Sequence, residues 1–257
     1  MIVDVNAWCG RWPFRRLAFA GAAGLVKLLE RTGTDLALVS PISGAFYRDC
    51  LTAMEEMLED AGWDERRMKP VAVVNPTFPG WQEDLEAMVR GMGCAAVRLI
   101  SNYHGYTLYD EVALQVAKRV LDRGLPLVVT MRMQDERSHH WCMPVRPVAV
   151  EEVQFLMRQL PEATYVLSNI WYSEVRSLRR ELEMVRQGAW EMSYKPPAFF
   201  VEQAVEEFGP ERVLYGSGAP LQYPESLLLP VQEADVSQQA KELILGGNAA
   251  RLFGLGG

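Results

Sequence analysis

The sequence predicts an α/β fold in which eight parallel strands and eight helices alternate in one (β/α)8 barrel. Three observations favour this fold class. The chain has 257 residues, close to the ~250 typical of one such barrel. Short apolar runs alternate with longer amphipathic ones, which is the pattern of repeated strand–helix units. Several of the short runs are apolar throughout, as expected for strands that are buried on both faces.

The strands are expected where these short apolar runs occur. In chain order they cover residues 2–6, 35–40, 70–75, 95–100, 126–131, 164–169, 189–193 and 212–217. Each should point its carboxyl end toward the face of the barrel that carries the active site in this fold.

The helices are expected where apolar residues recur at three- and four-residue spacing. The clearest cover residues 51–61, 85–92, 112–123, 153–160, 199–208 and 237–253. Glycines follow several helices, where a left-handed C-cap favours this residue; they are Gly33, Gly62, Gly93, Gly124 and Gly209. We expect one domain over residues 1–257, because a second would leave too little chain for either core.

Composition excludes several classes of partner. The formal net charge is −7, whereas nucleic acids and anionic membranes require clustered Lys and Arg. No apolar run approaches the ~20 residues of a membrane span. The four cysteines, Cys9, Cys50, Cys94 and Cys142, lie far apart, so neither a zinc ribbon nor a disulfide scaffold is predicted. We expect a cytoplasmic protein.

The two ends of the chain carry a family resemblance. Residues 211–220 read ERVLYGSGAP, residues 247–254 read GNAARLFG, and residues 4–10 read DVNAWCG. These resemble the amidohydrolase-related family of metal-dependent hydrolases and decarboxylases. Its first strand reads Asp-x-His-x-His-x-Gly, its eighth ends Gly-Ser-Asp-x-Pro, and its last helix reads Asn-Ala-x-x-Leu-Phe. Residues 124–130 and 160–169 resemble its fifth and sixth strands. The resemblance implies a metallo-dependent-hydrolase-like TIM barrel.

All five positions at which this family carries metal ligands hold other residues here. The two first-strand histidines correspond to Asn6 and Trp8, those of strands five and six to Thr130 and Asn169, and the eighth-strand aspartate to Gly218. Asn and Thr are weak neutral ligands, Trp offers only an N–H donor, and Gly offers no side chain. Such residues cannot supply the imidazole and carboxylate ligands of a zinc-type site. We therefore expect no divalent metal and no other cofactor.

Two arginines indicate what replaces the metal. Arg98 lies near the end of the fourth expected strand and Arg132 just past the fifth. Because arginine binds carboxylates and phosphates through two parallel hydrogen bonds, we predict a small anionic ligand of the carboxylate type. Its hydrogen-bond partners would be Asn6, Asn169 and Tyr103. In the alternative, each arginine is paired with Glu191 or another acid of the barrel.

Two loops rich in polar residues, 101–109 and 132–147, carry the three histidines of the chain. His104 is predicted to line the ligand site, and His139 is a candidate general acid or base because imidazole titrates near neutrality. Surface positions for the histidines are the alternative. Trp8 either fills the space of the metal or stacks against a ligand.

Three functions remain open. The first is a non-hydrolytic or weakly active homologue, a possible pseudoenzyme, that binds a small anion through Asn6, Trp8, Tyr103, His104, Thr130, Asn169 and Gly218. The second is a metal-independent lactone or activated-ester hydrolase, or a decarboxylase, using Arg98, Arg132, Glu191 and His139 as catalytic residues. The third is an interaction partner of an active paralogue, with Trp63, Trp81 and Trp190 as surface anchors. By analogy with other barrels a homodimer is possible, but the sequence itself does not indicate an oligomeric state.

Overall fold

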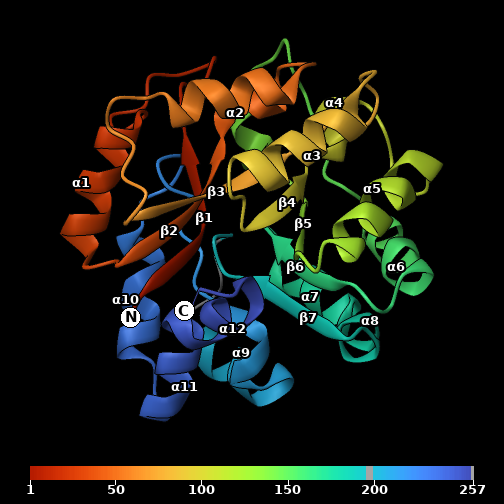
Figure 1. Ribbon diagram of the computed structural model, residues 1–257. Helices are drawn as coiled ribbons and strands as arrows, with labels where there is room; N and C mark the ends of the chain where they lie inside the picture. Colours follow the sequence, from red (N-terminus) through yellow and green to blue (C-terminus); the bar gives the residue numbers. More distant parts are fainter. Residues whose placement is uncertain (195–198, 256–257) are drawn as a thin grey trace.

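The computed structural model describes residues 1–194 and 199–255, and these contain eight parallel strands arranged in sequence order around a barrel (Figure 1). The strands are β1 (Val3–Cys9), β2 (Leu36–Pro41), β3 (Met68–Val73), β4 (Ala96–Leu99), β5 (Leu127–Thr130), β6 (Thr164–Ser168), β7 (Gln187–Glu191) and β8 (Val213–Leu214). Three backbone hydrogen bonds join the segment around the last strand to the first strand, from Val5 N to Tyr215 O (3.0 Å), from Gly218 N to Asn6 O (2.8 Å) and from Trp8 N to Ala219 O (2.7 Å). The predicted (β/α)8 fold class is confirmed.

Helices surround this barrel (Figure 1). The longer ones are α1 (Ala22–Thr32), α2 (Cys50–Leu58), α3 (Trp81–Gly91), α5 (Glu111–Asp122), α6 (Val150–Gln159), α9 (Phe200–Phe208) and α10 (Glu225–Glu233). The shorter ones are α4 (Ser101–His104), α7 (Tyr172–Ser177), α8 (Arg179–Met184), α11 (Gln238–Glu242) and α12 (Asn248–Phe253). None of the helices in the described part of the chain is long and apolar enough to cross a bilayer.

The strict alternation of one helix after each strand is not what the structure shows. Two short helices, α7 and α8, follow β6, and α10 to α12 follow β8. The helix expected over 237–253 is split by a π-helical turn, Leu243–Gly247. Phe199 is the N-cap of α9 rather than its first residue, and it has a positive φ of 61°.

Several strands end earlier than predicted, and for β7 and β8 the reason is that side chains or distant backbone take over their hydrogen bonds. After Glu191, the amide of Ser193 donates to Glu191 Oε2 at 2.5 Å, so β7 stops two residues short. After Leu214, the amide of Tyr215 donates to Ile244 O at 3.0 Å. The amide of Ser217 donates to Asp4 Oδ1 at 2.9 Å.

The predicted glycine caps are only partly correct. Gly33, Gly93 and Gly124 have φ values of +64°, +64° and +67°, so these three adopt positive φ. Gly209 combines a φ of 77° with a ψ of 148°, which lies outside the left-handed helical region. Gly62 is needed for close packing, because a Cβ there would lie 2.2 Å from the backbone N of Ala23.

Candidate functional site

The interior of the barrel changes from apolar to polar along the strand direction. One buried apolar layer includes Ala96, Val128, Val166 and Ala189, from four consecutive strands. Because alternate side chains of a strand point to the same face, the residues two positions further on also face the barrel interior. They form the next layer toward the carboxyl ends of the strands. At these positions the sequence has Arg98, Thr130, Ser168 and Glu191. Together with Asn6, Asn169 and Ser193 we call these residues the polar layer, and all of them are buried.

Arg98 is the one cation of this layer. Its Nη1 lies 3.0 Å from Asn6 Oδ1, 3.0 Å from Thr130 Oγ1 and 3.2 Å from Ser168 Oγ. Burial lowers the pKa of Arg98 to about 10, and the charges of Glu191 and Asp4 act in the opposite direction. The guanidinium therefore stays protonated at neutral pH. Two of its partners, Asn6 and Thr130, are positions at which the sequence resemblance implies a metal ligand.

Glu191 is the carboxylate of the layer and accepts several hydrogen bonds. Its Oε1 lies 2.5 Å from the backbone N of Asn169 and 2.8 Å from Ser193 Oγ. The same oxygen is 3.0 Å from Ser168 Oγ and 3.1 Å from Asn6 Nδ2, and Oε2 accepts from the backbone N of Ser193. Burial raises the pKa of Glu191, while these hydrogen bonds lower it. The carboxyl group is held rigidly, with donors at both oxygens.

Arg132 is paired with an acid other than the one considered from the sequence. Its Nη1 and Nη2 lie 2.8 and 2.5 Å from the two carboxylate oxygens of Glu174, at the start of α7. Nη1 also donates to Asn169 O at 3.0 Å, and the ring of Tyr194 lies 5.3 Å from Cζ. For Arg132 the structure thus shows the ion-paired alternative, with Glu174 in place of Glu191.

Trp8 covers the polar layer. Its side chain is fully buried, and Arg98 Cζ lies 4.4 Å from the centre of its ring. It belongs to a buried apolar cluster with Ile42, Met133 and Leu221, among others. The polar layer is therefore enclosed between apolar side chains on both sides. Such packing matches the space-filling role expected for Trp8, although a stacking contact with a cation is part of it.

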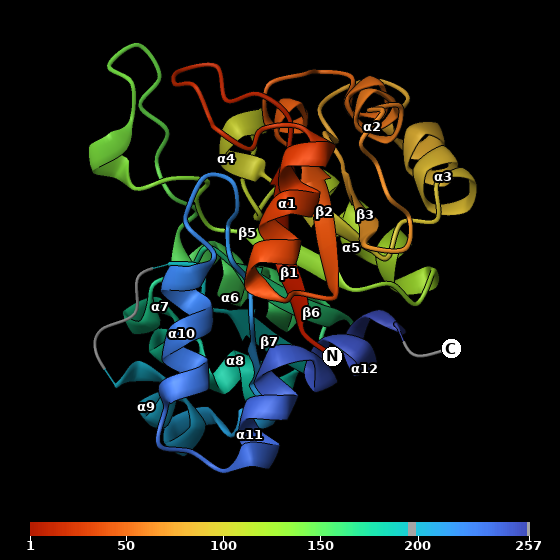
Figure 2. The ribbon, with the colours of Figure 1, turned by 90° about the vertical axis from the view of Figure 1, so that its left-hand side faces the viewer.

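The loop residues predicted for the site lie elsewhere. His139 contacts its own loop, accepting from the backbone N of Val145 at 3.3 Å. Figure 2 shows this loop, drawn in green, projecting beyond the helices beside the segment that follows β1. His104 lies 2.8 Å from Gly44 O through Nε2, and the ring of Tyr103 packs edge-on against Phe46. Tyr103 also packs against the apolar cluster that contains Trp8. Among the described residues, His139, His104 and Tyr103 form no hydrogen bond or ring contact with the polar layer.

Gly218 contributes backbone to the site. It adopts a φ of +68°, which favours glycine, and its amide closes the barrel through Asn6 O.

Sequence reasoning did not single out Asp4, Ser168 and Glu174. Asp4 accepts from the amide of Ser217, and burial raises its pKa. Ser168 could have been found from its position two residues after the buried Val166, whereas no local signal points to Glu174.

The donors of the polar layer do not fit a divalent metal ion. They comprise one carboxylate, two amides and three hydroxyls, and the guanidinium of Arg98 lies among them. Within residues 1–194 and 199–255, no group of three or more His, Cys, Asp or Glu side chains could hold a metal.

Gly216 leaves room for the carboxylate of Glu191. A Cβ at this position would lie 2.5 Å from Glu191 Oε2 and 3.0 Å from Asn6 Cβ. We expect Gly216→Ala to destabilise the protein by about 1–3 kcal/mol, because overpacking forces a buried group to shift. Urea denaturation measures this loss.

Gly91→Ala is the matched control, since a Cβ at the end of α3 would meet nothing within 4 Å. Equal stabilities of the two variants would contradict the packing described for Glu191.

Comparisons with known proteins bear on the whole chain. A family model described as "Amidohydrolase" matches residues 43–255. No match was found among curated proteins. The fold is similar to that of 2,6-dihydroxybenzoate decarboxylase from Rhizobium, with a TM-score of 0.73, 14% identity, and coverage of 100% of this chain and 99% of that chain.

Two further solved structures show the same fold. One is a dihydroxybenzoic acid decarboxylase from Polaromonas with bound manganese and 2-nitroresorcinol, with a TM-score of 0.73, 13% identity, and 99% and 97% of the two chains covered. The other is a probable 2-pyrone-4,6-dicarboxylic acid hydrolase from Acinetobacter baumannii with citric acid bound, with a TM-score of 0.65, 17% identity, and 98% and 99% covered. At these identities the likeness shows the fold alone. The family model spans most of the sequence, and the chain therefore belongs to the amidohydrolase family.

Proposed function

We propose that this protein is a metal-independent member of the amidohydrolase family that binds a small carboxylate without hydrolysing it. The proposal rests on the position of the Arg98 guanidinium and on its hydrogen-bond donors. Arg98 supplies the positive charge of the polar layer, and its Nε and Nη2 still have hydrogen-bonding capacity for an anion.

The first support is the position of the guanidinium. Arg98 Nη1 is within hydrogen-bond distance of Asn6 and Thr130, and Asn6 Nδ2 is 2.5 Å from Asn169 Oδ1. Three of the five family ligand positions are thus joined in one hydrogen-bonded set around a cation. A divalent ion placed there would be repelled by the guanidinium charge.

The second support is the free edge of Arg98. Its Nε and Nη2 are buried and have no hydrogen-bond partner among the described residues. This is the edge that Arg66 and Arg137 use to bind Asp64 and Asp135 in the same molecule. A buried donor without a partner costs about 1–3 kcal/mol, so an acceptor at this edge would be stabilising. A carboxylate fits it with two parallel hydrogen bonds.

The hydrogen bonds to both carboxylate oxygens of Glu191 favour binding over catalysis. Donors surround both of its oxygens, so it is not free to take a proton from a substrate or water. A general base must come within hydrogen-bond reach of the proton that it abstracts, and His139 contacts its own loop.

Trp81 and Trp190 are buried, so the surface anchors considered for an interaction partner are wrong for these two residues.

The similar structures suggest which carboxylates to test. Their names include dihydroxybenzoate decarboxylases and a protein with citric acid bound. Suitable probes are benzoate, 2,6-dihydroxybenzoate and citrate, with benzamide as the uncharged control. Because Arg98 lies beneath Trp8, entry requires side chains of the apolar cover to move.

Thermal denaturation with each probe tests the proposal. We expect at least one carboxylate to raise Tm, because a ligand that binds only the native state stabilises it, and we expect benzamide to leave Tm unchanged. In Arg98→Lys, which keeps the charge and loses the two-donor edge, the shift should disappear. The proposal would be wrong if no carboxylate raised Tm, or if benzamide raised it equally.

A further inference from the structure

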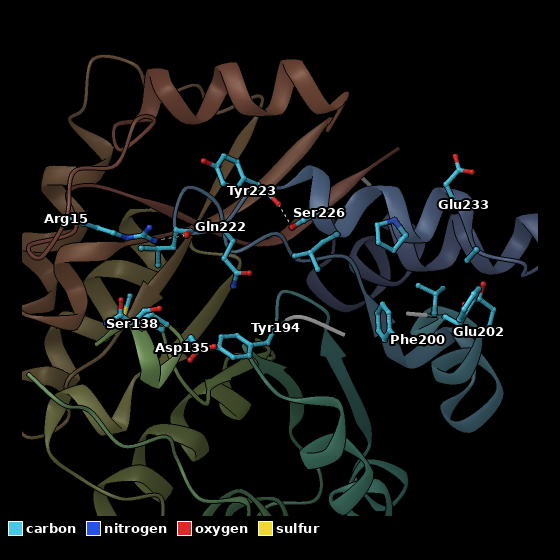
Figure 3. A pocket seen from close by; sticks show the side chains of 18 residues that line it. Arg15, Asp135, Ser138, Tyr194, Phe200, Glu202, Gln222, Tyr223, Ser226 and Glu233 are labelled. Atoms are coloured by element: carbon cyan, nitrogen blue, oxygen red, sulfur yellow. Dashed lines mark hydrogen bonds between the residues drawn. The ribbon is translucent and has the colours of Figure 1, made fainter. Parts of the chain in front are cut away.

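A large cavity lies beside the barrel mouth, separate from the polar layer. Its volume is about 990 Å³, and its walls come from the loops after β1, β5, β7 and β8 together with α9 and α10 (Figure 3). Ligand pockets in proteins span roughly 300–1,000 Å³. We call it the side cavity. Met133 and Leu221 line it and also pack in the apolar cluster that contains Trp8, so these side chains separate the cavity from Arg98.

The two ends of the side cavity differ in charge. Figure 3 shows Arg15, Gln222 and Ser138 at one end, and Glu202 and Glu233 at the other. At the first end Asp135 is also present, but it forms an ion pair with Arg137 at 2.5 Å. Arg15 uses Nη2 to donate to Leu221 O at 2.8 Å, and its remaining N–H groups carry the positive charge of this end. An anionic group is therefore favoured at the Arg15 end and disfavoured at the Glu202 end.

The middle of the side cavity is apolar and aromatic. Phe200 and Leu227 form its walls and are both 2% exposed. Phe199 and Tyr223 also line the cavity and are 78% and 77% exposed, so their rings are accessible to a guest. Aromatic walls favour an aromatic guest, because aromatic rings attract each other in offset and edge-to-face arrangements.

Tyr194 offers a hydrogen bond inside the cavity. It lines the wall, is 5% exposed, and its hydroxyl has no hydrogen-bond partner among the residues described. In Figure 3 its hydroxyl points toward the end at which Asp135 and Ser138 lie. Burial raises the pKa of Tyr194, so the group keeps its proton and acts as a donor to an acceptor at that end.

We propose that the side cavity is a second binding site, which takes a multi-ring aryl carboxylate with its carboxylate toward Arg15 and Tyr194 and its rings between Phe200 and Leu227. It does not depend on the carboxylate site at Arg98. The two sites differ in size, since the cavity accommodates several rings whereas the edge of Arg98 is enclosed.

Calorimetric titration with 4-biphenylcarboxylate tests this site, with 4-biphenylcarboxamide as the uncharged counterpart. Wild-type protein should bind one carboxylate molecule, and the carboxamide more weakly. Arg15→Gln should weaken carboxylate binding about tenfold, because a hydrogen bond to a charged group contributes about 1.5–3 kcal/mol. Tyr194→Phe should weaken it about fivefold, from the loss of one ordinary hydrogen bond.

Arg16→Gln is the matched control, because it removes the same charge one residue further along and does not line the cavity. It should bind like wild type. The side-cavity proposal is overturned by a lack of binding, by equal binding of the carboxamide, or by unchanged binding in both Arg15→Gln and Tyr194→Phe. Loss of binding in Arg98→Lys with full binding in Arg15→Gln would also overturn it, and would assign the molecule to the polar layer. Benzoate stabilisation of wild type is measured separately, so either site can fail alone.

Discussion

Arg98→Met is expected to destabilise the protein by about 3–5 kcal/mol, the cost of removing one partner from a buried set of charges. Methionine keeps much of the length of the side chain and loses the cation. Glu191 and Asp4 are both buried and both interact with the charge of Arg98. Without Arg98, their negative charges would no longer be balanced by a positive charge in the polar layer. Oxygens of Asn6, Thr130 and Ser168 would each lose a donor. Equilibrium denaturation in urea measures the change.

Arg66→Met is the control for this substitution. The Arg66 side chain is 89% exposed and pairs with Asp64 at the surface, where ion pairs contribute little. The stability of the Arg66→Met variant should match that of the wild-type protein. If Arg98→Met were equally harmless, the buried cation would not hold the polar layer together.

Glu191→Gln is expected to cost about 2–3 kcal/mol although it preserves the shape of the side chain. Backbone N–H groups face both carboxylate oxygens, that of Asn169 at Oε1 and that of Ser193 at Oε2. A glutamine amide would therefore oppose its NH₂ to a backbone N–H in either orientation, and one buried donor would lose its acceptor. The substitution also removes the negative charge beside Arg98.

Glu183→Gln provides the comparison for Glu191→Gln, since Glu183 is 58% exposed and pairs with Arg179 within α8. Denaturation curves of the two variants should differ clearly. A Glu191→Gln protein as stable as Glu183→Gln would mean that the two backbone amides find other acceptors.

The fold could be predicted from sequence because strand periodicity and length are local properties. All eight strands were expected at the correct places, since apolar runs at regular spacing reflect burial on both faces. The ends of β7 and β8 were wrong because their hydrogen bonds are completed by Glu191, Asp4 and the π-helical turn. Those partners are distant in sequence or belong to side chains, and a periodic pattern carries no information about them.

The candidate site was predictable where it lies on strands and not where it lies on loops. Asn6, Arg98, Thr130, Asn169 and Glu191 were all selected from the sequence, and the structure brings them into one hydrogen-bonded layer. The barrel fixes their relative positions, because inward-facing residues of neighbouring strands must meet at its axis.

The two loop histidines lie away from the polar layer for a physical reason. His139 and His104 were chosen because their loops follow strands on the active-site face, yet a long loop can turn away from the axis. The pairing of Arg132 with Glu174 joins residues 42 positions apart, and no spacing rule connects them. The side cavity lies between α9, α10 and four loops, so it depends on tertiary packing that sequence periodicity does not describe.

Metal analysis of protein purified without chelators, followed by calorimetric titration with manganese and zinc, tests the central claim most directly. If the guanidinium of Arg98 supplies the positive charge at the top of the barrel, purified protein will hold far less than one metal ion per chain, and neither ion will give a binding isotherm. One equivalent of tightly bound metal, lost on changing Asn6 or Glu191 to Ala, would contradict this.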